Sequence, residues 1–344
     1  MSSTDSSTDS SADSSSGRST EYSILVPFVP RRPEQLLPFA GLVHWTGASR
    51  LWQGQGMTTE PYQGFAHAAG AGFRVPTGLG VTLMPMRHPY EAALQAKSLS
   101  LITGESVVAG FGPGSKDMQR AMRGEPYRSP LTAAREYLTA VRGALTGTPE
   151  VMAGEYWHQA GRLAPLPGPQ VELGLGVLRP GMAKVAGELA DVAITWLTPA
   201  RYLSEVIVPA LAAGAGAAER AVPRIAAIVP VALAADGRDP AKLALASNGA
   251  HLSLPHYRDM LRRGGIALPE GEFDAADAEA QALALVKGDA FVYGAAEEVL
   301  DKLGAYRDAG VDEIVLNVTG VASLEGPSAA SHELKRLLQL LGRS

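Results

Sequence analysis

The chain has 344 residues, of which 46% are hydrophobic and 19% are charged, so it can form one large domain or two smaller ones around a sizeable core. A net charge of −5 gives no broad attraction to nucleic acid, and the absence of cysteine excludes disulfides, thiolate metal sites and a cysteine nucleophile. No apolar run reaches the ~20 residues of a membrane span. We therefore expect a cytoplasmic protein that binds neither nucleic acid nor membranes.

The first 20 residues are rich in serine, aspartate and threonine and contain no apolar segment of the kind found in secretory signals. A segment of this composition cannot bury enough apolar surface to offset the entropy of ordering. We predict a disordered tail over residues 1–20 and a folded domain over residues 21–344.

Eight apolar segments of strand length follow, and stretches of helix length separate them. They cover residues 22–29, 49–54, 73–85, 105–112, 170–176, 191–197, 224–235 and 312–320. Alternation of this kind predicts a parallel sheet with crossover helices, and eight units favour closure into a (β/α)8 TIM barrel. A doubly wound open sheet is the alternative. The long gap before the last strand predicts a helical insertion at about residues 236–290, which would serve as a lid or an oligomer contact.

A glycine-rich turn follows the fourth predicted strand, and active sites of such barrels lie at the C-terminal ends of the strands. Gly110, Gly112 and Gly114 precede Ser115, and Gly176 with Val177 ends the next strand. Turns of this type expose backbone N–H groups that bind phosphate. The alternative is a pair of tight β–α turns that need glycine for a positive φ. Two such turns on consecutive strands favour a ligand that carries phosphate.

The third strand reads "TGLGVTLMPMRHP" and contains two glycines that an apolar strand does not need unless its backbone bends or a ligand approaches it closely. This stretch, together with "ESVVAGFGPGSKD", "ELGLGVLRPGMAKVAGELADVAITWL" and "YGAAEEVLDKLGAYRDAGVDEIVLNV", resembles the bacterial luciferase-like superfamily of flavin and deazaflavin enzymes. The resemblance covers residues 22–320 apart from the insertion. It is strongest to the branch that uses coenzyme F420, whose reductases have a glycine turn similar to "GPGSK".

The resemblance implies an eight-stranded barrel, a homodimer and a cofactor site without a metal. A cis peptide bond at Gly80–Val81 would support the back of the cofactor ring, and Thr82 would face the ring. The positions that match the phosphate site of the family are Gly110, Gly112, Gly114, Ser115, Gly176 and Val177.

The sequence departs from the F420-dependent alcohol and sugar dehydrogenases at two positions. Gln55 stands where those enzymes carry a histidine, and Ser115 stands where they carry a glutamate. Glutamine cannot titrate, so the usual acid–base pair for alcohol oxidation is missing. We therefore expect reduced F420 to transfer hydride to an activated double bond, with dehydroalanine in a lanthipeptide-like peptide as a candidate substrate. Gln55 would bind a carbonyl or a ring nitrogen, and the proton would come from water or Tyr62.

Three aromatic residues near strand ends are candidates for the substrate pocket, namely Phe28, Trp157 and Trp196. Two other functions remain open at this point. An FMN-dependent monooxygenase would use the same phosphate turns, and a noncatalytic subunit of luciferase type would keep the fold without the cofactor.

Overall fold

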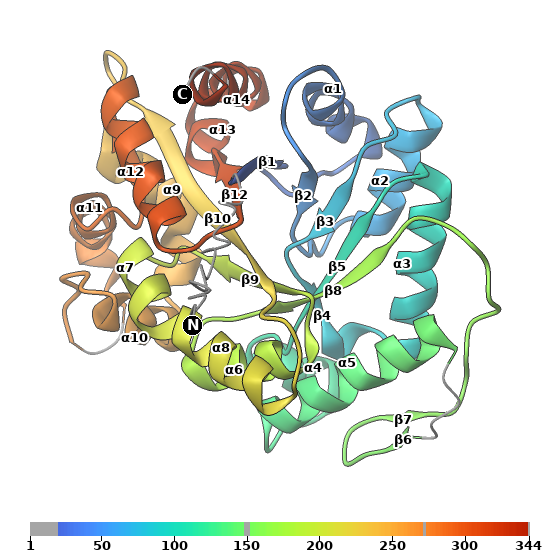
Figure 1. The fold of residues 1–344 in the computed structure, drawn as a ribbon. Helices are drawn as coiled ribbons and strands as arrows, with labels where there is room; N and C mark the ends of the chain where they lie inside the picture. Colours follow the sequence, from blue (N-terminus) through green and yellow to red (C-terminus); the bar gives the residue numbers. More distant parts are fainter. Residues whose placement is uncertain (1–19, 148–151, 271–272, 343–344) are drawn as a thin grey trace, which may run out of the picture.

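A closed barrel of eight parallel strands forms the centre of the molecule (Figure 1). The computed structural model describes residues 20–147, 152–270 and 273–342, so the predicted disordered tail lies outside the described residues except for Thr20. In barrel order the strands are β1 (Glu21–Leu25), β2 (Leu51–Gln53), β3 (Thr77–Leu79), β5 (Val107–Gly112), β8 (Val171–Gly176), β9 (Val192–Trp196), β10 (Arg224–Leu233) and β12 (Glu313–Asn317). Because β10 pairs with β12 at one end of this strand order and with β9 at the other, the sheet closes on itself and the open-sheet alternative is wrong.

Helices surround the barrel on its outer side, as Figure 1 shows. Those before the insertion are η1 (Pro33–Leu36), α1 (Leu37–Trp45), α2 (Pro61–Gly70), η2 (Met84–Met86), α3 (Pro89–Thr103), α4 (Lys116–Arg123), α5 (Pro130–Thr146), α6 (Pro180–Leu189), α7 (Ala200–Tyr202), η3 (Leu203–Ile207) and α8 (Val208–Ala217). After β12 come α13 (Thr319–Glu325) and α14 (Pro327–Leu341). None of the described helices combines the length and the apolar run that crossing a bilayer requires.

Local sequence signals account for where several of these helices begin and end. Proline opens α3 and α5, where its missing N–H group has no helical partner to lose. The Ser129 hydroxyl accepts the Thr132 N–H at the start of α5. Gly104 and Gly147 then end α3 and α5 with a φ of 72° at each, which glycine adopts without strain.

Two apolar cores lie on the two sides of the barrel wall. The inner core includes Trp52, Val108, Ile194 and Ile228, and the larger outer core fills the space between the strands and the helices. The Trp52 ring occupies so much of the interior that a Cβ atom on Gly78 would lie 2.4 Å from it. The glycine on the third strand is therefore needed for packing at this point.

The insertion between β10 and β12 is helical, as predicted. It contains α9 (Pro240–Leu252), α10 (Pro255–Arg263), η4 (Ala275–Asp277) and α11 (Ala278–Lys287), and α12 (Ala296–Asp308) follows as the crossover helix to β12. The Arg258 side chain joins α10 to α11 by donating to the Gln281 side chain, and it also donates to the Pro269 carbonyl at 2.9 Å. A short strand that the sequence did not reveal, β11 (Val292–Gly294), extends the sheet beside β10.

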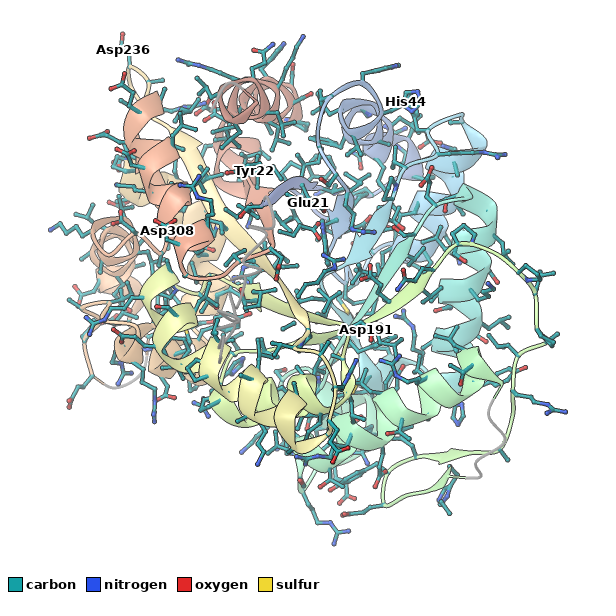
Figure 2. All side chains as sticks on the ribbon, in the orientation of Figure 1. Glu21, Tyr22, His44, Asp191, Asp236 and Asp308 are labelled. Carbon is teal, nitrogen blue, oxygen red and sulfur yellow. The ribbon has the colours of Figure 1, made fainter. Side chains whose placement is uncertain are left out.

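Ion pairs close the barrel at the N-terminal ends of its strands. The fully buried Glu313 carboxylate accepts from Ser23 and from the Trp52 indole, both at 2.6 Å, and from Arg224 at 2.8 Å. The Arg50 guanidinium lies 3.7 Å from the same carboxylate. Asp191, labelled in Figure 2 and placed just before β9, pairs with Arg142 and Arg220 at 3.0 Å each. This end of the barrel is therefore devoted to holding the fold together.

Candidate active site

The two glycine turns and the bend in the third strand meet at the C-terminal end of the barrel. The ladder between β5 and β8 places Gly110 beside Gly174 and Phe111 beside Leu175. The Val81 side chain lies between the ends of these strands, since a Cβ atom on Gly112 would come within 2.8 Å of one of its methyl groups and one on Gly176 within 3.2 Å of the other. The predicted convergence of residues 110–115 and 174–177 is thus present.

The bend itself separates β3 from the two-residue strand β4 (Thr82–Leu83), and the Gly80–Val81 peptide bond is cis as expected. The Val81 carbonyl accepts the Gln55 N–H at 3.1 Å, and the Gly80 N–H donates to the Gln53 carbonyl at 3.0 Å. Backbone hydrogen bonds therefore fix the bend against the end of β2.

Two of the predicted cofactor ligands have their polar groups in use within the barrel. The Thr82 hydroxyl is buried and donates to the Gly110 carbonyl at 3.0 Å, so it ties the bend to β5 instead of offering its proton to a ring. The Val177 N–H donates to the Ile194 carbonyl at 2.8 Å and is not available to a phosphate. The sheet uses both donors, and the positions of Thr82 at the ring and of Val177 at the phosphate stay predictions.

The phosphate turn ends at the start of α4. Gly114 has a φ of 71°, and the Ser115 hydroxyl oxygen caps the helix by accepting the Met118 N–H at 3.2 Å. The cap leaves the N–H groups of the first turn, at Lys116 and Asp117, without partners within the helix. An anion beside these groups would also gain from the helix dipole.

A polar cluster links the loop after β2 to the segment before α3. Arg87 donates to the Gln55 side chain and to the Glu60 carboxylate, at 3.3 Å in each case. The Arg87 guanidinium also lies 5.8 Å from the centre of the Tyr62 ring. Sequence analysis selected Gln55 and Tyr62 and missed Glu60. The available signal was a carboxylate directly before Pro61, at a helix start next to a strand end.

Burial controls the titration of this cluster. It raises the pKa of Glu60, although hydrogen bonds from backbone N–H groups and the Arg87 charge act in the opposite direction. It also raises the pKa of Tyr62, whose hydroxyl is buried and has no hydrogen-bond partner within the described chain. Tyr62 therefore keeps its proton at neutral pH and can donate it to an acceptor that enters the site.

The three predicted pocket aromatics have different surroundings. Trp157 lies on the hairpin of β6 (Met152–Ala153) and β7 (His158–Gln159) and packs edge-on against Tyr137, with ring centres 5.0 Å apart. Phe28 packs edge-on against Phe39 of α1 at 5.5 Å and belongs to the outer core. Trp196, at the end of β9, stacks on His251 of the insertion at 5.3 Å with an angle of 24° between the rings.

The insertion therefore contributes to this end of the barrel. Tyr257 packs edge-on against His251 at 4.8 Å, and Arg179 pairs with Asp259 of α10 at 2.9 Å. Burial lowers the pKa of His251 to about 4, and the His256 charge adds to the effect, so the imidazole is neutral at pH 7. The sequence alone does not place His251 on Trp196.

Several buried donors near the strand ends find no acceptor among the residues that the structure describes. They are Arg87 Nη1, Trp157 Nε1, Trp196 Nε1 and Asn317 Nδ2. A buried donor without an acceptor costs about 1–3 kcal/mol. A ligand with carbonyl, carboxylate or phosphate oxygens would supply acceptors to these groups.

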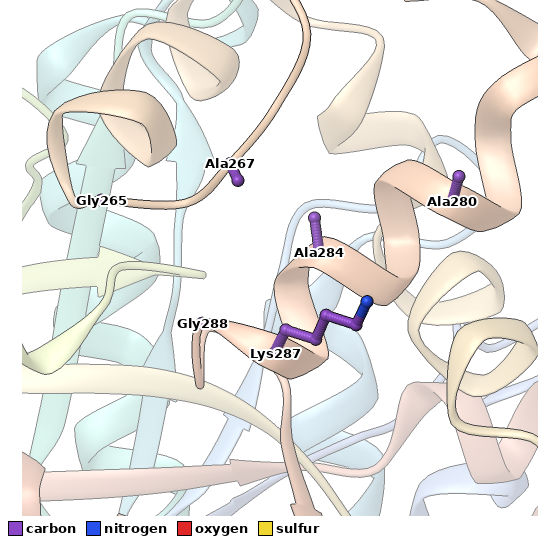
Figure 3. A pocket seen from close by; sticks show the side chains of 6 residues that line it. All are labelled: Gly265, Ala267, Ala280, Ala284, Lys287 and Gly288. Carbon is purple, nitrogen blue, oxygen red and sulfur yellow. The ribbon is translucent and has the colours of Figure 1, made fainter.

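Two hollows lie outside the barrel interior. One, of about 340 Å³, lies beside β2, η1 and α2 and includes Gln53 and Glu60 in its wall. The other, of about 290 Å³, lies between the Gly265–Ala267 loop and α11, where Lys287 is its single charged residue (Figure 3). The second hollow belongs to the insertion and contains none of the predicted site residues.

A closed parallel barrel with a bent third strand and glycine turns at the C-terminal strand ends has the architecture of a TIM-barrel protein. The family model described as luciferase-like monooxygenase matches residues 7–313. The chain therefore belongs to the luciferase-like monooxygenase family.

Similar proteins include two 5,10-methylenetetrahydromethanopterin reductases. The one from Methanolobus tindarius is 30% identical over 198 residues, which are 57% of this chain and 60% of that protein. The one from Methanopyrus kandleri is 27% identical over 276 residues, which are 71% of this chain and 76% of that protein.

Solved structures with the same fold include the coenzyme F420-dependent tetrahydromethanopterin reductase from Methanopyrus kandleri. It has a TM-score of 0.70 and 21% identity, and the match covers 93% of this chain and 99% of that chain. An F420-dependent secondary alcohol dehydrogenase has a TM-score of 0.67 and 18% identity, covering 92% of this chain and 99% of that one. A type II Baeyer–Villiger monooxygenase in complex with FMN, from Pseudomonas putida, has a TM-score of 0.64 and 16% identity, covering 92% and 96%. Oxidoreductases of both cofactor types thus share this fold.

Proposed function

We propose that the protein is an F420-dependent oxidoreductase that reduces an activated double bond. The proposal rests on the contact of the Gly80–Val81 bend with the ends of β5 and β8. Because these strands end in Gly112 and Gly176, the Val81 side chain packs against backbone there and not against other side chains. The similarity to a coenzyme F420-dependent tetrahydromethanopterin reductase and to an F420-dependent secondary alcohol dehydrogenase supports the choice of F420 over FMN.

The residues present fit a phosphate-bearing, flat redox cofactor. Gly112 and Gly176 leave room for the Val81 side chain at the bend, and the first turn of α4 offers N–H groups to an anion. The buried donors of Arg87 and Trp196 would match the carbonyl oxygens of a deazaflavin ring. When bound, the reduced deazaflavin would supply the hydride.

The chain's own residues would orient the substrate and supply a proton. Gln55 is held by Arg87 through its side-chain oxygen, and its side-chain nitrogen donates to the Gly56 carbonyl at 2.7 Å. The amide is therefore fixed in place and serves to position, since it does not titrate. Tyr62 keeps a proton at neutral pH, and Glu60 is a titratable group two residues before it.

Reduction suits these groups better than alcohol oxidation. Oxidation of an alcohol needs a base near neutral pH that removes the hydroxyl proton, and neither Gln55 nor the helix-capping Ser115 can serve as one. Reduction of a double bond needs one proton donor, for which Tyr62 or water suffices. Within this class we propose dehydroalanine in a modified peptide as a candidate substrate, and we propose that the protein works as a homodimer.

The test is a parallel titration of the purified protein with F420 and with FMN, followed by tryptophan fluorescence. Trp196 and Trp157 are near the proposed site, so we expect saturable quenching by F420 at lower concentrations than by FMN. Reduced F420 and a dehydroalanine peptide should then give a product with two more hydrogen atoms and oxidised F420. Tighter binding of FMN together with oxygen consumption would assign the protein to the flavin monooxygenases. No binding of either cofactor would support the noncatalytic subunit instead.

A further inference from the structure

The cavity of about 340 Å³ beside β2 lies on the outer side of the barrel wall and not in the barrel interior. Successive residues of a strand point to opposite faces. Leu51 belongs to the outer core and Trp52 to the inner core, so Gln53 shares the outer face with Leu51. The Gln53 side chain therefore points between β2 and the helices η1 and α2.

Gln53 is the unusual residue of this cavity. Its side chain is 3% exposed, and within the described residues its Oε1 atom has no hydrogen-bond partner. The same position would accept leucine if only packing mattered, because Leu36 and Gly64 form the neighbouring wall. A buried amide oxygen that no protein donor satisfies points to a donor that arrives from outside.

Apart from Pro33, the remaining wall is polar, with His67 at its edge. It includes Thr58, Thr59, Glu60 and Gln63. The Glu60 carboxylate accepts from the Gln63 N–H at 3.0 Å and pairs with Arg87 at 3.3 Å, so its charge is compensated. At about 30 Å³ for each water, the cavity has room for roughly ten waters or a ligand of about a dozen non-hydrogen atoms.

We propose that this cavity is a second binding site, separate from the barrel interior, for a small neutral molecule that carries several hydroxyl or amide N–H donors. Gln53 Oε1 accepts from one of them, and the Glu60 carboxylate accepts from another. Arg87 contacts both Glu60 and Gln55. A molecule bound to Glu60 therefore also affects the Gln55 side chain, which follows β2.

Two variants test the site without requiring a cofactor or a reaction. Gln53→Leu keeps the volume and removes the unsatisfied acceptor, so it should leave the melting temperature unchanged or higher. Gly64→Ala fills the cavity, because the added Cβ atom lies 3.1 Å from Leu36 and 3.8 Å from Gln53 Oε1. The matched control is Gly216→Ala, a helix glycine of α8 whose Cβ atom would meet nothing within 4 Å.

The probes are myo-inositol, which is neutral and carries six hydroxyls, and cyclohexanol, which has the same ring and one hydroxyl. Binding is followed by NMR through the backbone amide signals of Gln63 and Gly64 and the side-chain amide of Gln53. We expect saturable shifts with myo-inositol, weaker ones with cyclohexanol, and a dissociation constant at least tenfold higher in both variants but not in the control. No saturable shift with myo-inositol, equal binding of the two probes, or unchanged binding in Gln53→Leu would overturn the proposal.

Discussion

Glu313 is the residue on which the N-terminal end of the barrel depends, and Glu313→Gln tests that role. The variant keeps the shape of the side chain and removes its charge. The Gln amide oxygen can still accept from Ser23 and Trp52, but its NH₂ group would face the Arg224 guanidinium, which now lies 2.8 Å from Glu313 Oε2. Arg50 and Arg224 would then share Glu172 as their carboxylate in this network.

Breaking a buried ion pair by removing one partner costs about 3–5 kcal/mol. An unfolding entropy of about 2.1 cal/mol/K per residue gives roughly 0.7 kcal/mol/K for a chain of 344 residues. The expected fall in the melting temperature is therefore about 4–7 °C. A matched control is Glu205→Gln, because Glu205 pairs with Arg201 on the surface at 2.9 Å and such pairs contribute less than about 1 kcal/mol.

The pH dependence of the difference in melting temperature between the parent protein and Glu313→Gln gives a second check. Burial by itself raises the pKa of Glu313, but Arg50, the Ser23 hydroxyl and Arg224 outweigh it and hold the pKa below the ordinary 4.5. A depressed pKa in the folded state means that the stabilisation is present above pH 4.5 and is lost as the pH falls through the folded value. Calorimetry should therefore show that the melting temperatures of the variant and the parent protein approach each other as the pH falls below 4.5. A fall of less than 1 °C at neutral pH, equal to that of the control, would refute this account of the barrel end.

Three further predictions concern the opposite end of the barrel. His251→Phe should flatten the stability profile between pH 6.5 and about 4, because the unfolded chain takes up a proton there that the buried, folded imidazole does not; an unchanged slope in thermal melts would contradict this. Gly112→Ala should fold and weaken cofactor binding at least tenfold, since the new Cβ atom lies 2.8 Å from a Val81 methyl group that can move. Gly110→Ala should fail to give soluble protein, since its Cβ atom would lie 2.0 Å from the Leu79 carbonyl oxygen, and normal folding of this variant would show that the bend is loose.

The sequence predicted the barrel well because its signals are local and repeated. Each of the eight strands is an apolar run, and the glycines of the third and fourth strands stand where side chains would collide with Trp52 or Leu79. Closure of the sheet into a barrel was predicted from the number of strand–helix units, which is eight. The strand β11 was not among the predicted strands.

The candidate site was predictable only in part, because contacts between side chains depend on closure of the barrel. Glu60 and Arg87 are 27 positions apart, and nothing local indicates that they meet. His251 reaches Trp196 from an insertion whose path the sequence does not fix. Thr82 and Val177 have donors that could bind a ligand. In the structure the Thr82 hydroxyl donates to the Gly110 carbonyl and the Val177 N–H donates to the Ile194 carbonyl.

Buried polar atoms without a hydrogen-bond partner among the described residues lie at both ends of the barrel, including Arg50 Nε and Thr77 Oγ1 at the N-terminal end. Glu313 has three hydrogen bonds at the N-terminal end, whereas the indole donors of Trp157 and Trp196 have no acceptor within the described chain. A protein selected for stability alone would replace such donors, because each costs about 1–3 kcal/mol when left unpaired. A ligand that supplies acceptors recovers that cost and binds only the folded state, so it stabilises the fold in proportion to its affinity. A cofactor that supplies acceptors to Trp157 and Trp196 should therefore raise the melting temperature.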